Sequence, residues 1–217
     1  MAQSEKIMQV TFIRTAARRY AIHVQRVDAP DALMAPAPGY DSDLPHDVLH
    51  MVVEAILGLR RGIFGQPAAG GLAGTFRIVA APGVIGRTAT RQRRQADLRD
   101  AAQRKGGRGD AAQSERAAYL CWQEWLSRST SKAHRAEAAK MAQTAKQIRD
   151  GAPSEELAAL SPQVLDGICT RLDRVHECWS TLPVGGSIRL TWPTLAIVAE
   201  TPSSPGDHPE SANLRAT

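Results

Sequence analysis

The beginning of the chain alternates apolar and polar residues with a period of two. Between residues 7 and 26 the alternating apolar positions are Met8, Val10, Phe12, Tyr20, Ile22 and Val24. This alternation, rich in β-branched residues, is typical of strands that bury one face. We therefore predict a β-hairpin that turns at residues 16–18. His23 lies in the polar phase of the second strand, so we expect it to be solvated.

Shorter patterns predict three further strands and a late helix. The strands are expected around Leu33-Met34, over 75–79 and over 187–192. Ser161 and Pro162 form a typical helix start. The apolar residues that follow recur at helical spacing and are Leu165, Ile168, Leu172, Val175 and Trp179. This spacing predicts a helix with one buried face.

A helix that is apolar on nearly every side is predicted over residues 45–57. Pro45 suits the first turn of a helix, and Gly58 is a typical stop signal. Apolar residues occupy one side and also lie among the polar residues of the other: Leu44, Val48, Val52, Ala55 and Leu59, then Leu49, Val53 and Leu57. Such a helix is buried, so its polar side chains need partners. The small-residue loop over 62–74 lacks the Gly-x-Gly-x-x-Gly spacing of a dinucleotide site, and we expect it to cover the polar stripe.

The polar residues of this helix fall at a spacing that suits a metal ion. His46, Asp47, His50 and Glu54 follow the pattern His-Asp-x-x-His-x-x-x-Glu, and residues four apart share one helix face. Two imidazoles one turn apart can bind one divalent ion, zinc above all. We predict His46, His50 and Glu54 as metal ligands and Asp47 and Glu54 as catalytic groups. The obvious suppliers of another ligand are His176, Glu177 and Cys178.

The motif departs from that of zinc peptidases at one position. Asp47 stands where a glutamate acts as general base in His-Glu-x-x-His enzymes. Its carboxylate is one methylene shorter and would lie further from a metal-bound water, which counts against peptidase activity but not against metal binding. The alternative is structural, because Asp47 favours the positive end of the helix dipole and both histidines would bond to backbone carbonyls. Both interpretations stay open.

Two longer stretches resemble a family of uncharacterised bacterial proteins that is common in actinobacteria. The first runs from Pro38-Gly-Tyr-Asp through Leu-Pro-His-Asp-Val-Leu-His-Met-Val-Val-Glu to Leu57-Gly-Leu-Arg-Arg-Gly-Ile-Phe-Gly-Gln and Ala-Ala-Gly-Gly. The second is Trp179-Ser-Thr-Leu-Pro-Val-Gly-Gly-Ser-Ile-Arg-Leu-Thr-Trp. This resemblance supplies no function. The His-Asp-x-x-His core is also similar to the zinc motif of a ubiquinone-biosynthesis protein family, in which the ligand glutamate lies further downstream than Glu54.

The middle of the chain carries the positive charge. Residues 85–150 hold 15 Lys and Arg against 7 Asp and Glu, whereas the remainder holds 12 against 15. Residues 87–110 are rich in Arg, Gln and Gly and poorly amphipathic, so we expect them to be mobile. Two helices over 110–127 and 131–149 are expected to form a hairpin that projects from the core, with His134 solvated.

Together these patterns predict an α+β domain: a small, mostly antiparallel sheet packed on a buried central helix and a late helix, with a basic helical insertion. We expect residues 1–84 and 151–200 to form the core, 85–150 the insertion, and 201–217 a disordered tail with a solvated His208. No apolar run of about 18 residues predicts a membrane span. The chain also shows no signal peptide and no Cys-x-x-Cys pair among its three cysteines. We therefore expect a cytoplasmic protein.

Three functions are compatible with these observations. The first is a metal-dependent hydrolase or lyase, acting on an unknown small molecule or peptide, and it is favoured because the polar stripe is buried. The second is association with nucleic acid through cations that track phosphates without reading sequence. These cations are Arg87, Arg91, Arg93, Arg94, Arg99, Arg104, Lys105 and Arg108. The third is a protein-interaction module that docks partners on Trp122 and Trp125.

Overall fold

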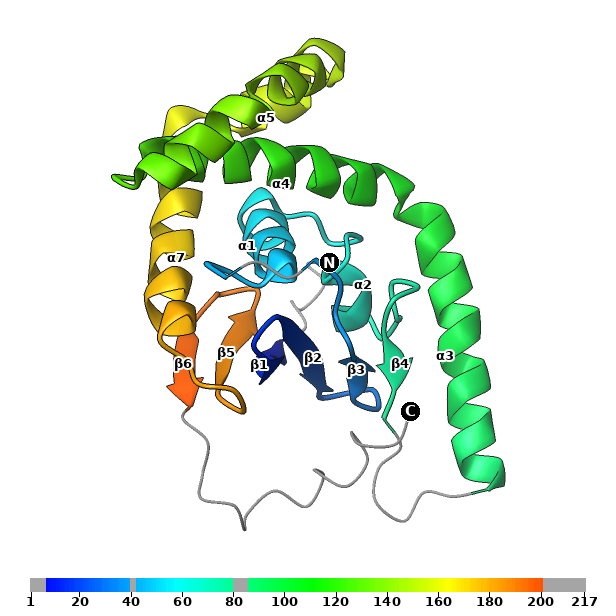
Figure 1. The fold of residues 1–217 in the computed structure, drawn as a ribbon. Helices are drawn as coiled ribbons and strands as arrows, with labels where there is room; N and C mark the ends of the chain where they lie inside the picture. Colours follow the sequence, from blue (N-terminus) through cyan, green and yellow to red (C-terminus); the bar gives the residue numbers. More distant parts are fainter. Residues whose placement is uncertain (1–6, 40–41, 80–85, 201–217) are drawn as a thin grey trace.

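The computed structural model describes residues 7–39, 42–79 and 86–200, which form seven helices and one six-stranded sheet (Figure 1). The strands are β1 (Met8–Ala16), β2 (Arg19–Arg26), β3 (Ala32–Met34), β4 (Arg77–Ile78), β5 (Ser187–Trp192) and β6 (Ile197–Glu200). The helices are α1 (His46–Leu57), α2 (Gly65–Ala68), α3 (Arg87–Gly106), α4 (Arg108–Arg128), α5 (Lys132–Gly151), α6 (Ser154–Ala159) and α7 (Pro162–Ser180). The predicted α+β class is confirmed. The tail over 201–217, with His208, lies outside the described residues.

The β1–β2 hairpin occupies the middle of the sheet, as its period-two pattern predicted. All strand pairs are antiparallel, in the order β4-β3-β2-β1-β5-β6. Phe12 of β1 lies opposite Ile22 of β2 and Ile188 of β5, and all three are fully buried. Such cross-strand apolar pairs are the main stabilising unit of a sheet. Strand β6 was not predicted, because its four residues are too few to show a pattern of alternation.

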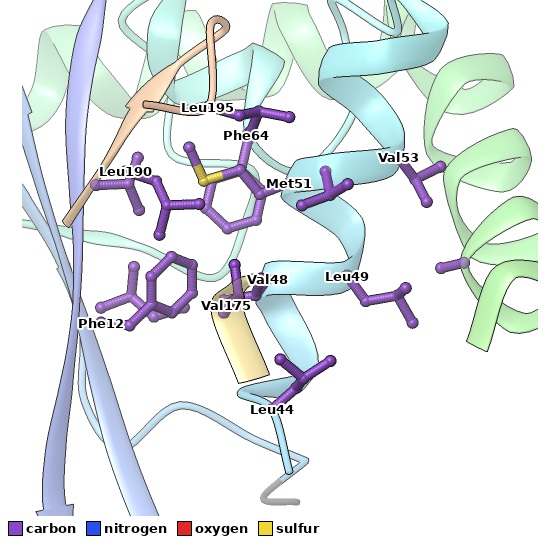
Figure 2. Packing of buried hydrophobic residues seen from close by; sticks show 14 of the residues in the cluster. Phe12, Leu44, Val48, Leu49, Met51, Val53, Phe64, Val175, Leu190 and Leu195 are labelled. Atoms are coloured by element: carbon purple, nitrogen blue, oxygen red, sulfur yellow. The ribbon is translucent and has the colours of Figure 1, made fainter. Parts of the chain in front are cut away.

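Helix α1 is buried between the sheet and helix α4, as its apolar pattern predicted. Figure 2 shows Val48 and Met51 packed among Phe12, Phe64 and Leu190 on the sheet side. Leu49 and Val53 point the other way, toward α4. Burial of one such side chain stabilises the fold by about 1.5–3 kcal/mol. Because α1 has apolar neighbours on two sides, its polar residues are enclosed with it.

Helix α7 packs beside α1 and confirms the predicted late helix. The side chain of Ser161 caps its first turn by accepting the backbone N–H of Val164 at 3.4 Å. Its buried residues recur at helical spacing and are Ile168, Cys169, Leu172, Val175 and Trp179. None of the helices in the described part of the chain is long and apolar enough to cross a membrane.

The prediction that the α4–α5 hairpin projects from the core is wrong for α4. Figure 1 shows α4 running across α1, and its buried side chains belong to the main hydrophobic cluster. These residues are Ala117, Ala118, Cys121, Trp125 and Leu126. Small alanines let α4 approach α1 closely, which a pattern of large apolar residues would not reveal. Since Trp125 is buried and Trp122 packs against the core, docking of a partner on these tryptophans loses its basis.

The prediction of a mobile stretch over 87–110 is also wrong. These residues form the 20-residue helix α3 and the start of α4. In Figure 1, α3 lies along the β4 side of the molecule and meets α4 at a corner. Only Ala96 and Asp100 are buried among the α3 side chains that the structure describes. Two buried positions, one of them charged, do not give α3 a recognisable amphipathic pattern in the sequence.

Candidate metal site on helix α1

Helix α1 begins at His46, after Pro45, and ends at Gly58, whose φ of 69° is left-handed. Glycine adopts this conformation without the steric cost that other residues pay, which explains the predicted stop. Three of the four predicted site residues are buried: Asp47 is 5% exposed, His50 2% and Glu54 0%. His46 is exposed, so the stripe leads from the surface at the start of the helix into the interior.

Glu54 holds the loop that follows α1. Its Oε1 accepts the N–H of Ile63 at 2.6 Å, and its Oε2 accepts those of Phe64 at 2.8 Å and Gly65 at 3.4 Å. A Cβ at Gly62 would lie 2.3 Å from the Glu54 Cδ, so only glycine allows this approach. The predicted role of the loop as a cover for the polar stripe is therefore confirmed at Glu54. Both oxygens of Glu54 serve the loop, which leaves Glu54 badly placed as a metal ligand.

Glu54 also anchors helix α4 through Ser114, a residue that the sequence did not single out. The Ser114 hydroxyl lies 2.8 Å from Glu54 Oε1 and 3.0 Å from His50 Nδ1. Burial raises the pKa of Glu54 to about 7, against the lowering effect of the four donors from Phe64, Ser114, Ile63 and Gly65. With Glu54 ionised, the Ser114 hydroxyl donates to the carboxylate, so the Nδ1–H of His50 donates to Ser114.

With Glu54 ionised, this chain of hydrogen bonds favours the His50 tautomer that is protonated on Nδ1 and has a lone pair on Nε2. Glu115 Oε2 lies 3.8 Å from Nε2, beyond hydrogen-bond distance. Burial, and then the neighbouring His46, lower the pKa of His50 to about 4. The ring is therefore neutral at pH 7. A lone pair and a carboxylate face each other with no proton between them, which is an arrangement that a cation would stabilise.

His46 lies beside His50 at the open end of the stripe. The two ring centroids are 5.1 Å apart, as expected for neighbours one helical turn apart. The His46 side chain packs on Gly39, where a Cβ would approach its Cβ and Cγ to 3.0 Å. Gly39 also has a left-handed φ of 69°, so both conformation and space require glycine there. The turn before α1 thus holds the exposed histidine close to the buried one.

Asp47 is bound to Tyr20 rather than directed at the histidine pair. Its Oδ2 forms a short hydrogen bond with the Tyr20 hydroxyl, which also lies 2.7 Å from the carbonyl oxygen of Pro38. The hydroxyl has one proton and two acceptors, so both contacts are hydrogen bonds only when Asp47 is protonated. Burial raises the pKa of Asp47, which favours that state. Asp47 is thus engaged by Tyr20, and its role as a general base stays a prediction from the motif.

The predicted suppliers of a third ligand lie in other surroundings. His176 Nδ1 contacts the carbonyl oxygen of Asp43 at 3.0 Å. His134 bonds to Asp43 Oδ2 at 3.1 Å and to Ser129 Oγ at 2.9 Å, so its predicted solvation is wrong. His23 is only partly exposed and pairs with Asp31 at 3.1 Å. Asp43 therefore holds two histidines, one from α5 and one from α7.

The residue that approaches the histidine pair is Glu115, which sequence reasoning missed. It is 67% exposed and follows Ser114 on α4, more than 60 positions beyond His50. No local sequence pattern indicates a role for residues 114 and 115, because their position beside His50 depends on how α4 packs on α1. As it stands, the described part of the chain contains no group of three or more His, Cys, Asp and Glu side chains that could hold a metal ion.

Comparison with known proteins gives no functional assignment for this arrangement. No protein-family model, no curated protein and no solved structure matches the chain. The resemblance to an actinobacterial family and to a zinc motif of ubiquinone biosynthesis stays a prediction.

Proposed function

We propose that the protein binds a divalent metal ion through His46 and His50, with Glu115 as the third ligand. The observation that carries this proposal is the His50–Ser114–Glu54 chain, which favours an unprotonated Nε2 at 3.8 Å from Glu115 Oε2. Histidine ligands typically donate their other N–H to a partner that fixes the tautomer, and Ser114 supplies that acceptor. Glu54 then supports the ligand His50 through Ser114 and does not contact the metal.

The distances suit a zinc-like ion after a small side-chain movement. With metal–nitrogen and metal–oxygen bonds of about 2.0–2.2 Å, tetrahedral ligand atoms lie roughly 3.3–3.6 Å apart. Nε2 of His50 and Oε2 of Glu115 are 3.8 Å apart, and the exposed Glu115 side chain is free of the core. A rotation of the Glu115 side chain would bring its carboxylate and His50 Nε2 to this spacing.

A site with three protein ligands leaves a position for water, and bound zinc lowers the pKa of that water to about 7. This is the chemistry that a metal-dependent hydrolase or lyase would use on a small molecule or peptide. Asp47 positions the start of α1 through Tyr20 in this proposal and takes no part in proton transfer.

Titration calorimetry of the untagged chain with ZnCl2, MnCl2 and, without oxygen, FeSO4 tests the proposal. We expect one ion per chain for at least one metal, and a loss of affinity of tenfold or more in Glu115→Gln and in His46→Ala. Both side chains are exposed, so both variants should keep the fold, which circular dichroism checks. Ser114→Ala should weaken binding about 10–100-fold through the tautomer of His50.

Glu137→Gln is the matched control, because it removes another exposed carboxylate, from α5. The proposal fails if none of the three metals binds to the wild type. It also fails if Glu115→Gln binds as tightly as Glu137→Gln.

A further inference from the structure

Helix α3 carries a concentration of cations that the proposed metal site does not use. Its 20 residues hold seven Arg and Lys against two Asp, and one of those, Asp100, is buried. Oδ1 of Asp100 accepts the N–H of Leu72 at 3.0 Å and that of Gly74 at 3.2 Å. With Ala96, one turn earlier, it defines the side of α3 that faces the core. The remaining side of the helix is presented to solvent.

The side of α3 opposite to these anchors is a cationic face. At 100° per residue, it consists of positions about half a turn from Ala96 and Asp100. Its described members are Arg91, Arg94, Leu98, Ala101 and Lys105, all exposed. Within the described residues, Arg91, Arg94 and Lys105 form no ion pair, so their charge is not neutralised inside the protein.

Helix α5, with three Lys and two Arg against one Glu and one Asp, holds two of its lysines in ion pairs. Lys140 pairs with Glu137 at 2.8 Å, and Lys146 pairs with Asp150 at 2.6 Å. These are the i,i+3 and i,i+4 pairs that stabilise an exposed helix surface. Among the described residues, the cationic face of α3 shows no such pair, although both helices have 20 residues. General solubility therefore does not explain it.

We propose that the cationic face of α3 binds the phosphate backbone of a nucleic-acid duplex without reading its sequence. A helix of 20 residues is about 30 Å long, which suits contact with several successive phosphates. The α3 sequence contains no aromatic residue, so it has no platform on which the bases of a single strand would stack. Leu98 is the one large apolar side chain of the face, which is too little for insertion into a lipid surface.

Fluorescence anisotropy with the full chain and a labelled 24-base-pair DNA duplex tests this proposal in 50–300 mM NaCl. We expect binding that does not distinguish two unrelated sequences and that weakens steeply with salt. The variant Arg91→Glu/Arg94→Glu/Lys105→Glu should bind at least tenfold more weakly at 100 mM NaCl. Its plot of log K against log salt should be less steep by about 2.7, since each lost phosphate contact removes about 0.9.

The matched control is Lys132→Glu/Lys140→Glu/Lys146→Glu on α5, which changes net charge by the same amount at exposed positions. It should bind within about twofold of the wild type. Equal loss in the two variants would mean that net charge alone drives binding, and the proposal would be wrong. It would also be wrong if the wild type ignored the duplex at 50 mM NaCl. Tighter binding to the separated single strand, or to vesicles containing phosphatidylserine, would likewise overturn it.

Discussion

Helices α1 and α3 each carry a stripe of polar side chains, but the two stripes are built in opposite ways. On α1, Asp47, His50 and Glu54 are buried, and each has a defined hydrogen-bond partner. On α3, Arg91 and Arg94 are exposed and make no ion pair within the described residues. Buried polar groups cost free energy unless they are paired, whereas exposed charges cost almost nothing. The α1 stripe therefore bears on stability, while the α3 stripe is free to serve a partner.

The largest effect is expected from removing Glu54. Glu54→Ala leaves the N–H groups of Ile63 and Phe64 and the hydroxyl of Ser114 without their acceptor. Each unsatisfied buried group costs about 1–3 kcal/mol, so we expect a loss of roughly 3–5 kcal/mol in the free energy of unfolding. Urea denaturation measures it. Glu115→Ala removes an exposed carboxylate and should change the free energy of unfolding by less than about 0.5 kcal/mol. Similar losses in the two variants would contradict the view that only the buried polar residues of this site bear on stability.

The second largest effect is expected in the pH dependence of the free energy of unfolding. The pKa of Glu54 is raised from 4.5 to about 7, so its contribution to stability falls as pH rises through this window. The pKa of His50 is lowered from 6.5 to about 4, so its contribution falls as pH decreases from 6.5 toward 4. The two slopes oppose each other between pH 4.5 and 6.5.

Removing His50 should therefore expose the slope of Glu54. In His50→Gln, stability at pH 5 relative to pH 7 should rise by roughly 2 kcal/mol compared with the wild type, about 1.5 pKa units at 1.36 kcal/mol each. Urea denaturation at the two pH values measures the difference. His23→Gln, at a partly exposed site, provides the control. An unchanged difference in His50→Gln would show that the His50–Ser114–Glu54 chain does not titrate as described.

The smallest and most local effect is expected at the anchor of α3. Asp100→Ala removes the acceptor for the N–H groups of Leu72 and Gly74 and should cost about 1–2 kcal/mol. Amide hydrogen exchange should accelerate mainly over residues 87–106, because α3 has few other contacts with the core. Asp97→Ala, at an exposed position of the same helix, should leave exchange unchanged. Uniform acceleration across α1 and the sheet would show that α3 is part of the cooperative core.

The sequence predicted those elements whose apolar residues follow a local periodic pattern. The β1–β2 hairpin, strand β5 and helix α7 were predicted because their apolar residues alternate or recur at helical spacing. The ends of α1 followed from Pro45 and Gly58. The histidine pair was likewise visible from its spacing on one helix.

The remaining features depend on contacts between distant segments. Glu115 and Ser114 gain their meaning only when α4 packs on α1, and the alanines that permit this packing leave a weak pattern. Glu54 was predicted as a ligand because spacing cannot show that a loop would take both of its oxygens. Helix α3 was missed because Ala96 and Asp100 alone hold it, amid residues that resemble a disordered segment.

The strand order has a consequence for how the chain folds as it is made. Strand β1 pairs with β2 on one side and with β5 on the other, and Gln9 bonds to Thr191 across 182 positions of sequence. At a synthesis rate of about 5–20 residues per second, β5 emerges roughly 10–40 seconds after β1. During this interval the hairpin has an unpaired edge, which is the kind of surface on which chains associate wrongly. Closure of the sheet is therefore a late step of folding. Strand β5 must pair with β1 before the exposed edge of β1 pairs with another chain.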